Sequence, residues 1–300
     1  MNQINLWRVN LKPVGISEAA DYCIKYGIVG IGWGVNPTPA RKDDYLKYGR
    51  KEYEKDGPNR GWRKATNAFL FEMSRNHLVW TRTVDGKYYL GRIKGRWKYY
   101  SDKEHADLHM VNTRTVDWQE VGEVSLVPGK IFNSFSRGGT VRHIDDETVL
   151  QYSMHLYNKL VGKKYYNVER VKIDNIFSML HPEDLEDVVG LYLQITHDYV
   201  LQPSTCKKDT QLYEAKLVSK DGRRVGYFQV KSGSEDIDCA AFTHLRGTVY
   251  LFTAMGNYLN QEGNRNIVII DKGDLQEFII ENMKIMTERL RFWMESVYRV

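Results

Sequence analysis

Three polar residues of different chemistry occupy matching positions on two β-rich runs in the last third of the chain. The runs flank Asp221-Gly222, which suits the positive φ angles of a two-residue type I′ turn, so they are predicted to form a β-hairpin. Counting outward from that turn places Glu214 opposite Gln229, with Cβ atoms roughly 5 Å apart. Strand alternation puts Lys231 on the same face. A carboxylate, an amide and an amine gathered there could bind a hard cation and stabilise a developing negative charge.

The opposite face of the hairpin is predicted to enter a core, because its side chains are mostly apolar. They are Tyr213, Ala215, Leu217, Phe228 and Val230. Lys216 shares the polar face and is expected to be solvated, and Asp209 is a competing acid further from the turn. An exposed cross-strand ion pair between Glu214 and Lys231 is the structural alternative to a catalytic role.

An acidic residue followed on the next strand by a (D/E/Q)-x-K tripeptide is the signature of the PD-(D/E)XK nucleases. Glu214 with Gln229-Val230-Lys231 resembles the Mrr-like restriction endonuclease branch, and the Pro203-Ser204-Thr205 and Gln-Val-Lys-Ser-Gly runs add to the resemblance. It implies an α/β sandwich with a mixed central sheet and phosphodiester hydrolysis with Mg²⁺ or Mn²⁺. Gln229 departs from the many relatives that carry Glu or Asp there, which leaves one carboxylate fewer for the metal.

The resemblance also implies a role for each residue of the site. Glu214 would be the main metal ligand, and Gln229 would contribute through its side-chain carbonyl or an adjacent backbone carbonyl. Lys231 would position the attacking water and stabilise the pentavalent phosphate. Glu186, on the helix predicted before the hairpin, matches the acid that reaches the metal site in such nucleases, with Glu183 as the alternative. Acidic residues early in a helix are also ordinary complements of its dipole.

The elements that would position this site can be predicted along the second half of the chain. A helix beginning at Pro182 has an apolar stripe suited to packing inward. Continuous apolar runs at 248–253 and 266–270 fit central strands of a sheet that is covered on both faces. A last helix is predicted over about 274–297. Together these elements form the α/β sandwich that the nuclease resemblance requires.

The first half of the chain is rich in short predicted strands and poor in helices, which favours a small β-barrel. A second Asp-Gly turn, at Asp85-Gly86, joins predicted strands 78–84 and 87–93, and a third strand at 95–100 continues that hairpin. Further strands are predicted at 4–10, 28–34, 110–118 and 141–144, and helical segments at 17–27 and 61–73.

Several of these segments resemble the PUA-like barrels of the EVE and YTH type: Leu6-Trp7-Arg8-Val9, Gly30 to Trp33, Leu78-Val79-Trp80 and Tyr88 to Ile93. That resemblance implies a reader domain that holds a modified or flipped-out base between aromatic side chains. Trp33 is the first candidate for such a cage because flanking glycines open space around it, followed by Trp80 and Trp97. Arg82 and Arg92 could contact phosphates. Barrel-core tryptophans and a solvated charged face are the structural alternatives.

The length of 300 residues is sufficient for two cores, and we expect an α+β protein of two domains. The predicted parts are a PUA-like reader domain at 1–145, a helical linker at 146–168 and a nuclease domain at 169–300. The content of 42% hydrophobic and 27% charged residues is typical of a globular protein, and the net charge of +5 is compatible with a polyanionic partner.

Composition disfavours membrane and secreted classes. No apolar run approaches the ~18 residues that a membrane span needs, and the first residues lack the pattern of a secretory signal. The three cysteines, Cys23, Cys206 and Cys239, are widely spaced, so they predict neither a disulfide framework nor a zinc site. We therefore expect a cytoplasmic protein without a membrane partner.

The combined patterns favour a metal-dependent DNA endonuclease of the restriction, anti-phage type, whose N-terminal domain recognises modified bases. DNA is the expected partner, and a homodimer is the candidate assembly. The alternative from another class is a non-catalytic reader of modified nucleic acid, for which Gln229 is the argument. An RNA-directed nuclease is a third hypothesis, since PUA-like barrels also serve RNA.

Overall fold

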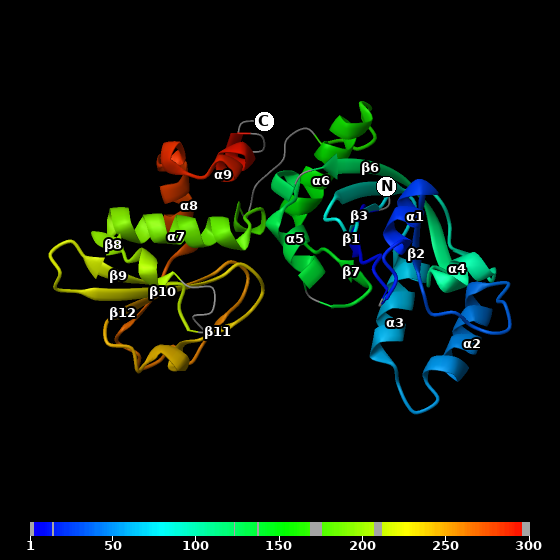
Figure 1. Ribbon diagram of the computed structural model, residues 1–300, viewed down its shortest axis with the longest axis horizontal. Coiled ribbons are helices and arrows are strands. Elements are labelled where there is room, and N and C mark those ends of the chain that lie inside the picture. The colour runs from blue at the N-terminus through cyan, green and yellow to red at the C-terminus, as the bar shows by residue number, and fades with distance from the viewer. Residues whose placement is uncertain are drawn as a thin grey trace. The chain divides into compact units, whose positions relative to one another are not determined.

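The computed structural model describes residues 3–13, 15–122, 124–136, 138–168, 176–206 and 212–295 (Figure 1). It contains both helices and extended sheets in each half, so the chain is of the α+β class. The chain divides into two compact units. The first comprises Met1–Val127 and Ser134–Glu169, and the second comprises Pro128–Asn133 and Arg170–Val300.

The first unit is built on a curled seven-stranded sheet with the strand order β2-β6-β4-β3-β1-β7, and β5 pairs with β6. All neighbouring strands are antiparallel except β1 and β3, which run parallel. The strands are β1 (Leu6–Val9), β2 (Ile28–Ile31), β3 (Leu78–Arg82), β4 (Tyr88–Ile93), β5 (Lys98–Tyr99), β6 (Asn112–Gly122) and β7 (Val141–His143).

Helices pack around this sheet and bury a core rich in aromatic residues. Trp7, Tyr45, Trp62 and Phe69 lie in one cluster and are almost fully buried. The helices are α1 (Ala19–Lys25), α2 (Lys42–Tyr53), α3 (Arg60–Asn67) with a π-helical extension (Ala68–Glu72), α4 (Lys103–Asp107) and α6 (Glu147–Val161).

The segment 146–168, predicted to be a linker, is part of the first unit. Its helix α6 packs against β4 and β6 and buries six residues, among them Tyr152 and Leu156. Asp146 caps the helix by accepting a hydrogen bond from the Val149 N–H, and Gly162 ends it with a φ of +69°. Both helix ends therefore have the capping residues that the sequence offers. The apolar stripe of α6 packs against strands of the first unit, so this segment is part of that unit and is not a linker between two domains.

The strand expected at 95–100 does not continue the hairpin of β3 and β4. Instead, β5 pairs with β6, where Lys98 lies opposite Thr113. The hairpin itself closes through the Thr83 N–H, which donates to the Lys87 carbonyl at 2.9 Å, and Gly86 has a φ of +91°. The expectation that strand 95–100 pairs with the strand before it in sequence was therefore wrong. Strand β6 is long enough to pair with β4 along one part and with β5 along another.

The second unit contains a five-stranded mixed sheet with the order β14-β12-β10-β9-β8. Strands β8, β9 and β10 are antiparallel, whereas β10, β12 and β14 are parallel. A separate two-stranded sheet joins β11 (Ile237–Asp238) to β13 (Tyr258–Leu259). The strands of the main sheet are β8 (Tyr199–Leu201), β9 (Ala215–Ser219), β10 (Val225–Lys231), β12 (Thr248–Thr253) and β14 (Ile267–Ile269).

Helix α7 (Pro182–Thr196) lies across one face of this sheet (Figure 1). The stripe predicted from helical periodicity is Leu185, Val188, Val189, Tyr192 and Leu193, and all of these are buried except Tyr192, which is half-buried. The predicted C-terminal helix is broken into α8 (Lys272–Glu281) and α9 (Glu288–Trp293), with a 3₁₀ turn between them, and residues 296 and 297 lie outside the described residues. Both segments bury apolar residues, Leu275, Phe278 and Ile279 in α8 and Leu290 and Trp293 in α9.

The two apolar runs predicted to be central strands differ in position. Strand β12 is central and buried, as predicted. Strand β14 is an edge strand, and Val268 and Ile269 are 39% and 36% exposed. An apolar run indicates strand propensity but not position within the sheet.

Residues 128–133, which form most of α5 (Gly129–Ser136), belong to the second unit, although the sequence analysis assigned them to the first domain. The Gly129 N–H donates to the Met179 carbonyl at 3.0 Å, and the Phe132 ring lies 4.6 Å from that of His181. The Asn133 amide donates to the Ser232 hydroxyl at 3.2 Å. A fragment that starts at residue 169 would therefore lack part of this unit.

Gly129→Ala is expected to lower the free energy of unfolding of the second unit by about 2–3 kcal/mol. A Cβ at this position would lie 1.8 Å from the Leu180 carbonyl oxygen, which is backbone and has little freedom to move. Urea unfolding followed by circular dichroism measures the effect. Gly138→Ala is the matched control, because no atom lies within 4 Å of its Cβ position. Equal midpoints for the two variants would contradict the expected clash.

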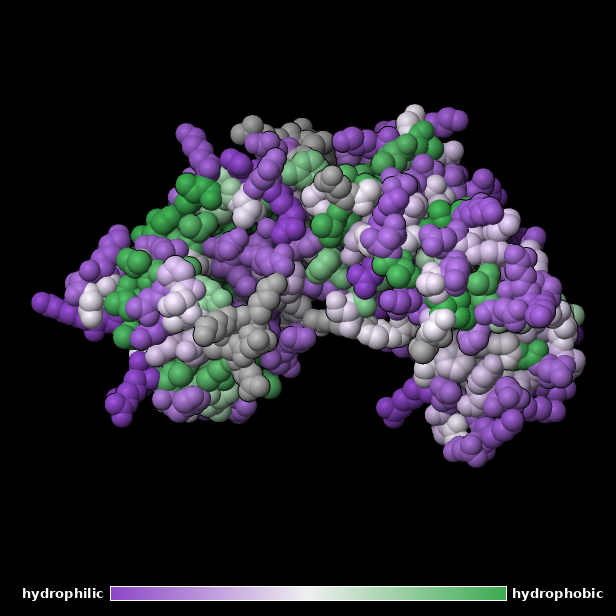
Figure 2. Space-filling view, in the orientation of Figure 1, coloured by the Kyte–Doolittle hydropathy of each residue, from purple (hydrophilic) through white to green (hydrophobic). Residues whose placement is uncertain are grey.

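Within the described ranges, no helix is long and apolar enough to cross a membrane. Hydrophilic residues dominate the face shown in Figure 2, where hydrophobic residues form small, separate patches.

Candidate functional site

The hairpin of β9 and β10 has the predicted register. Val218 pairs with Val225 and Ala215 with Phe228, and the Glu214 N–H donates to the Phe228 carbonyl at 2.8 Å. Continuing this register by one residue places Glu214 opposite Gln229.

The turn of this hairpin is not type I′, because only Gly222 of the Asp-Gly pair has a positive φ, +75°. The Gly222 N–H donates to the Ser219 carbonyl, and the Asp221 carboxylate accepts from Ser219 Oγ and from the Arg223 N–H. These local hydrogen bonds favour a type I geometry followed by glycine. The register is unchanged, because the same four residues connect Ser219 to Arg224.

The structure brings Glu214, Gln229 and Lys231 together. The Gln229 side-chain amide donates to Glu214 Oε1 and also to the Val230 carbonyl at 3.1 Å. Gln229 is only 6% exposed, whereas Glu214 and Lys231 are half-buried. The amide therefore holds the carboxylate beside the backbone carbonyl of Val230, at the point where the lysine side chain emerges from the strand.

The surroundings of Glu214 shift the pKa of its carboxyl group. Burial raises the pKa of this carboxyl above the ordinary glutamate value, and the Val230 N–H, the Lys231 charge and the Gln229 amide oppose that shift. Burial dominates, so the folded protein holds the proton more tightly than a solvated glutamate does. A nearby cation in addition to Lys231 would favour the ionised form.

The apolar face of the hairpin agrees with the sequence for four of five residues. Ala215, Leu217, Phe228 and Val230 are buried. Tyr213 was assigned to this face, but its ring lies 4.8 Å from that of Tyr227 on the polar face. Tyr213 precedes the first residue of β9, so strand alternation does not govern its direction.

The polar face is partly covered by a small apolar cluster that the sequence analysis did not predict. It contains Ile237, Cys239, Phe242, Val249 and Leu251, and Tyr227 packs against it. Leu251 is the register partner of Gln229 across β10 and β12. The short strand β11 and the 3₁₀ turn that follows it supply most of this cover. This neighbour explains why Gln229 is buried on a face predicted to be polar.

Glu186 lies in the second turn of α7, which packs on the apolar face of the hairpin. Its neighbour Asp184 is the buried acid of this helix and accepts from Arg289 Nε at 2.6 Å and Thr287 Oγ1 at 3.1 Å. Glu183 pairs with Arg289 at 3.7 Å. The competing acid Asp209 lies outside the described residues. Over the described part of the chain, no three His, Cys, Asp or Glu side chains form a group suited to a metal ion.

The donors at the hairpin still fit a hard divalent cation. They are one carboxylate, a side-chain amide oxygen and the Val230 carbonyl, and all are oxygen ligands. Mg²⁺ commonly takes one or two carboxylates and completes its octahedron with waters and substrate phosphate. Gln229 would have to exchange its present amide contact for a contact through its oxygen. The residues therefore fit a weak, water-rich Mg²⁺ or Mn²⁺ site, with Glu214 as its single charged ligand.

Without a divalent cation, the Glu214 carboxyl is expected to titrate above the ordinary glutamate pKa. The direction follows from burial, which raises the pKa of this carboxyl in the folded protein. NMR titration of the carboxyl carbons in EDTA from pH 3 to 8 measures it, with Glu214→Gln to assign the signal. A midpoint at or below the ordinary glutamate value would show that burial does not control this group.

The first unit contains a cavity of about 670 Å³ that includes Trp33, the first candidate for the base cage. Its lining residues come from the β1–α1 loop, β2 and the loop after it, α2, the α4–β6 connection and the segment before β7. They are Asn10, Lys12, Pro13, Gly30, Ile31, Gly32, Trp33, Gly34, Tyr53, Ala106, His109, Met110, Val111, Gly139 and Thr140.

The other two candidate tryptophans do not line this cavity. Trp80 is fully buried, and its indole N–H donates to Ser153 Oγ at 3.0 Å, so it is a core residue and cannot stack on a base. Trp97 packs against the core of the first unit and donates to Asn112 Oδ1 at 3.0 Å. The alternation of residues along a strand does not show whether a buried tryptophan belongs to the core or to a base-binding cage, because both kinds lie against the same sheet.

The loop that carries Trp33 is held by a carbonyl clamp, by which we mean the four side chains that donate to its consecutive carbonyls. Asn112 donates to Gly32, Tyr45 to Trp33, Tyr53 to Gly34 and Tyr99 to Val35. Trp33 has a φ of +67°, which is unusual for a bulky residue and costs on the order of 1–3 kcal/mol. The clamp holds this conformation in place.

The two predicted phosphate-binding arginines have partners within the first unit. The Arg82 guanidinium lies 5.1 Å from the centre of the Phe135 ring. Arg92 donates to Asn76 Oδ1 at 3.0 Å and lies 3.9 Å above the Tyr165 ring. Both are half-buried, and neither lines the cavity of Trp33. Their contact with phosphates stays a prediction.

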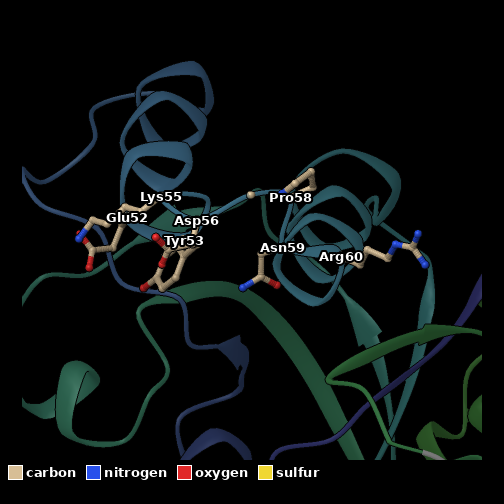
Figure 3. Close-up of a pocket in the computed structure, with 8 residues that line it drawn as sticks. Glu52, Tyr53, Lys55, Asp56, Pro58, Asn59 and Arg60 are labelled. Atoms are coloured by element: carbon tan, nitrogen blue, oxygen red, sulfur yellow. The ribbon is translucent and has the colours of Figure 1, made fainter.

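A second cavity of about 580 Å³ lies at the connection between α2 and α3 (Figure 3). Tyr53 lines both cavities. The remaining lining is of mixed charge, with Glu52 and Lys55 paired at 3.5 Å and Asp56 and Arg60 nearby. This balance gives the second cavity no preference for an anion.

A family model described as "Domain of unknown function (DUF8426)" matches residues 7–135, which is less than half of the chain. The match includes Trp33, all four side chains of the carbonyl clamp and most of the cavity lining, but not the hairpin of Glu214. No curated protein and no solved structure matches the chain.

Proposed function

We propose that this protein is a metal-dependent DNA endonuclease of the restriction, anti-phage type. The second unit would be the nuclease, of the Mrr-like PD-(D/E)XK type, and the first would be a PUA-like reader of modified bases. The observation that carries the proposal is the contact of Gln229 with Glu214 on paired strands, with Lys231 beside them. An exposed ion pair would not need a buried amide between the two charges.

The order of elements around the hairpin supports the nuclease part. Helix α7 precedes three antiparallel strands, β8 to β10, and β12 then adds in parallel to β10. Glu214 immediately precedes β9, and Lys231 ends β10. This succession is what the α/β sandwich of PD-(D/E)XK nucleases requires.

The residues of the hairpin divide the chemical work. Glu214 would hold the metal in its ionised form, and Gln229, whose amide donates to that carboxylate, would turn its side-chain oxygen to the metal. When bound, Mg²⁺ or Mn²⁺ acts as a Lewis acid on the phosphate oxygens. The Lys231 ammonium orients the attacking water and stabilises the negative charge that develops on the phosphate. The Asn133 amide holds Ser232 next to this lysine.

The cavity of Trp33 supports the reader part. A clamped loop, a strained tryptophan and neighbouring glycines present an aromatic face to a cavity large enough for a base. Flipped bases are recognised by stacking on such faces and by hydrogen bonds to their edges. The first unit would select the DNA and the second would cut it.

The test is cleavage of DNA by the purified protein. Phage DNA with modified cytosines, the same sequence without modification and a matching RNA are incubated with Mg²⁺, Mn²⁺ or EDTA. We expect metal-dependent cleavage of DNA, fastest on modified DNA, and none in EDTA. Cleavage of RNA alone would replace the DNA substrate by RNA. Absence of cleavage from every substrate under every metal condition would overturn the enzyme proposal.

One observation favours a second candidate function, a non-catalytic reader. Glu214 is the single carboxylate among the oxygen donors of the hairpin. If that site is too weak for a metal, the chain would still bind modified nucleic acid through the cavity of Trp33. Binding of modified DNA without cleavage at high Mn²⁺ concentration would support this function.

A further inference from the structure

The cavity of Trp33 combines a buried apolar wall with an exposed, polar outer edge. Ile31 and Met110 are almost fully buried, and Trp33 is half-buried beside them. Lys12 and His109 line the same cavity and are exposed. None of the residues described as lining the cavity is acidic. The cavity therefore offers an aromatic surface inside and cationic or polar groups at its mouth.

Trp33 is rigid because several contacts define its position. The Tyr53 and Trp33 rings are T-shaped, with centroids 5.1 Å apart and an interplanar angle of 89°, and the Tyr53 hydroxyl donates to the next carbonyl of the clamped loop. Burial raises the pKa of Tyr53 to about 12, so its hydroxyl stays a hydrogen-bond donor at neutral pH. One face of the indole is thus set before any ligand arrives, which lowers the entropy that binding costs.

His109 is the second strained residue of the cavity, with a φ of +53°. It approaches the tryptophan loop closely, because a Cβ on Gly32 would lie 3.2 Å from the His109 carbonyl oxygen. Two non-glycine residues in the left-handed region therefore line one cavity. Such strain persists where the surrounding structure holds it and is concentrated at ligand sites.

We propose that this cavity binds one nucleotide as a unit, with the base against Trp33 and the phosphate at Lys12 and His109. This inference rests on the proposed reader function. It specifies that the ligand is a nucleotide, with its phosphate, and not a free base or a nucleoside. The volume of about 670 Å³ lies within the range that encloses a drug-sized ligand, which exceeds what a base alone requires. Aromatic stacking tolerates any base, and a cation at the mouth adds affinity for the phosphate.

The nucleotide could be free or part of a strand, and the experiment has an arm for each source. Binding is measured by titration calorimetry in EDTA, so it does not depend on cleavage. The probes are the four deoxynucleoside 5′-monophosphates, the four nucleosides, inorganic phosphate and a single-stranded 12-mer. We expect a monophosphate or the 12-mer to bind at least about tenfold more tightly than any nucleoside, since hydrogen bonds to a charged group are stronger than those between neutral groups. Equal affinity for nucleoside and monophosphate, or binding of none of the probes, would overturn the proposal.

Variants assign the contacts without disturbing the fold. Trp33→Gly and His109→Gly remove a side chain at a positive φ, which glycine adopts without strain, so both variants should stay folded. We expect Trp33→Gly to abolish binding, and Lys12→Ala and His109→Gly each to weaken binding of the phosphate-bearing probe by about tenfold. Lys64→Ala, an exposed lysine outside the cavity, is the matched control. If Lys64→Ala and Lys12→Ala lowered the affinity for the phosphate-bearing probe equally, the lysines would act by general attraction of the negative charge, and Lys12 would not form a phosphate site.

Failure of this inference is distinguishable from failure of the nuclease proposal. Cleavage depends on Glu214 and Lys231 in the other unit, whereas these titrations contain no metal. A protein that cuts DNA but binds nucleosides and monophosphates equally would keep the enzyme and lose the nucleotide site.

Discussion

Lys231→Ala is expected to lower the single-turnover rate of DNA cleavage by about 10²–10³-fold, the loss found when one preorganised donor to a developing charge is removed. Lys231 ends β10 beside the buried Gln229 and the half-buried Glu214, and its charge acts on that carboxyl. The measurement uses excess enzyme over a labelled duplex at saturating Mg²⁺. Because the chemical step is followed directly, a change in DNA affinity does not enter the rate.

Lys216→Ala is the matched control for this variant. Lys216 lies on the same face of the same hairpin, is also half-buried and pairs with Tyr227. Lys216 is not among the groups that shift the pKa of Glu214, so its removal takes away an equal charge without acting on that carboxyl, and the rate should stay within about threefold, as for an ordinary surface charge. If both lysine variants lost cleavage equally, Lys231 would act through general attraction of DNA and not at the reacting phosphate.

Glu214→Gln is expected to abolish cleavage and, at the same time, to stabilise the folded protein slightly at pH 8. Cleavage should fall by at least about 10³-fold, because the proposed metal site would lose its single charged ligand. The raised pKa of Glu214 means that its contribution to folding is fully present below the unfolded-state pKa and is lost as pH rises through the folded value. The neutral amide avoids that loss. The side chain is half-buried, so the gain in Tm should be small, about 1–2 °C.

The two readouts separate a catalytic carboxylate from a structural ion pair. If Glu214 and Lys231 were only a stabilising pair, Glu214→Gln would lower the Tm and leave cleavage intact. The stability difference between the variant and the natural protein should also shrink at pH 4, where the carboxyl is mostly protonated in both states. Calorimetric scans at pH 4 and pH 8 measure it. A variant that is less stable at pH 8 and still cuts DNA would remove Glu214 from the active site.

The predictions that were confirmed depend on contacts between residues close in sequence. The pairing of Glu214 with Gln229 follows from counting outward from one turn, and the apolar stripe of α7 follows from helical periodicity. The turn type was wrong, yet the register was right, because both geometries use the same four connecting residues. Local pattern therefore predicted which side chains of the hairpin meet.

The predictions that were wrong depend on neighbours far apart in sequence. Trp80 was assigned to the base cage but is in the core, because α6 places Ser153 against its indole. Strand β14 was predicted to be central but is at the edge of its sheet. Residues 128–133 were assigned to the first domain but belong to the second unit. Propensity and periodicity carry no information on which distant segment will pack where.

The amino-acid sequence by itself determined the pairing of an acid, an amide and an amine on one hairpin, because strand alternation and a short turn act over a few residues. Only the tertiary structure decided that the amide is buried under a separate apolar cluster and that burial raises the pKa of Glu214. It also decided that Trp33 lines a cavity that neither Trp80 nor Trp97 lines. The physical reason is that burial and cavity shape are sums over contacts from segments distant in the chain, and these exist only once the chain has folded.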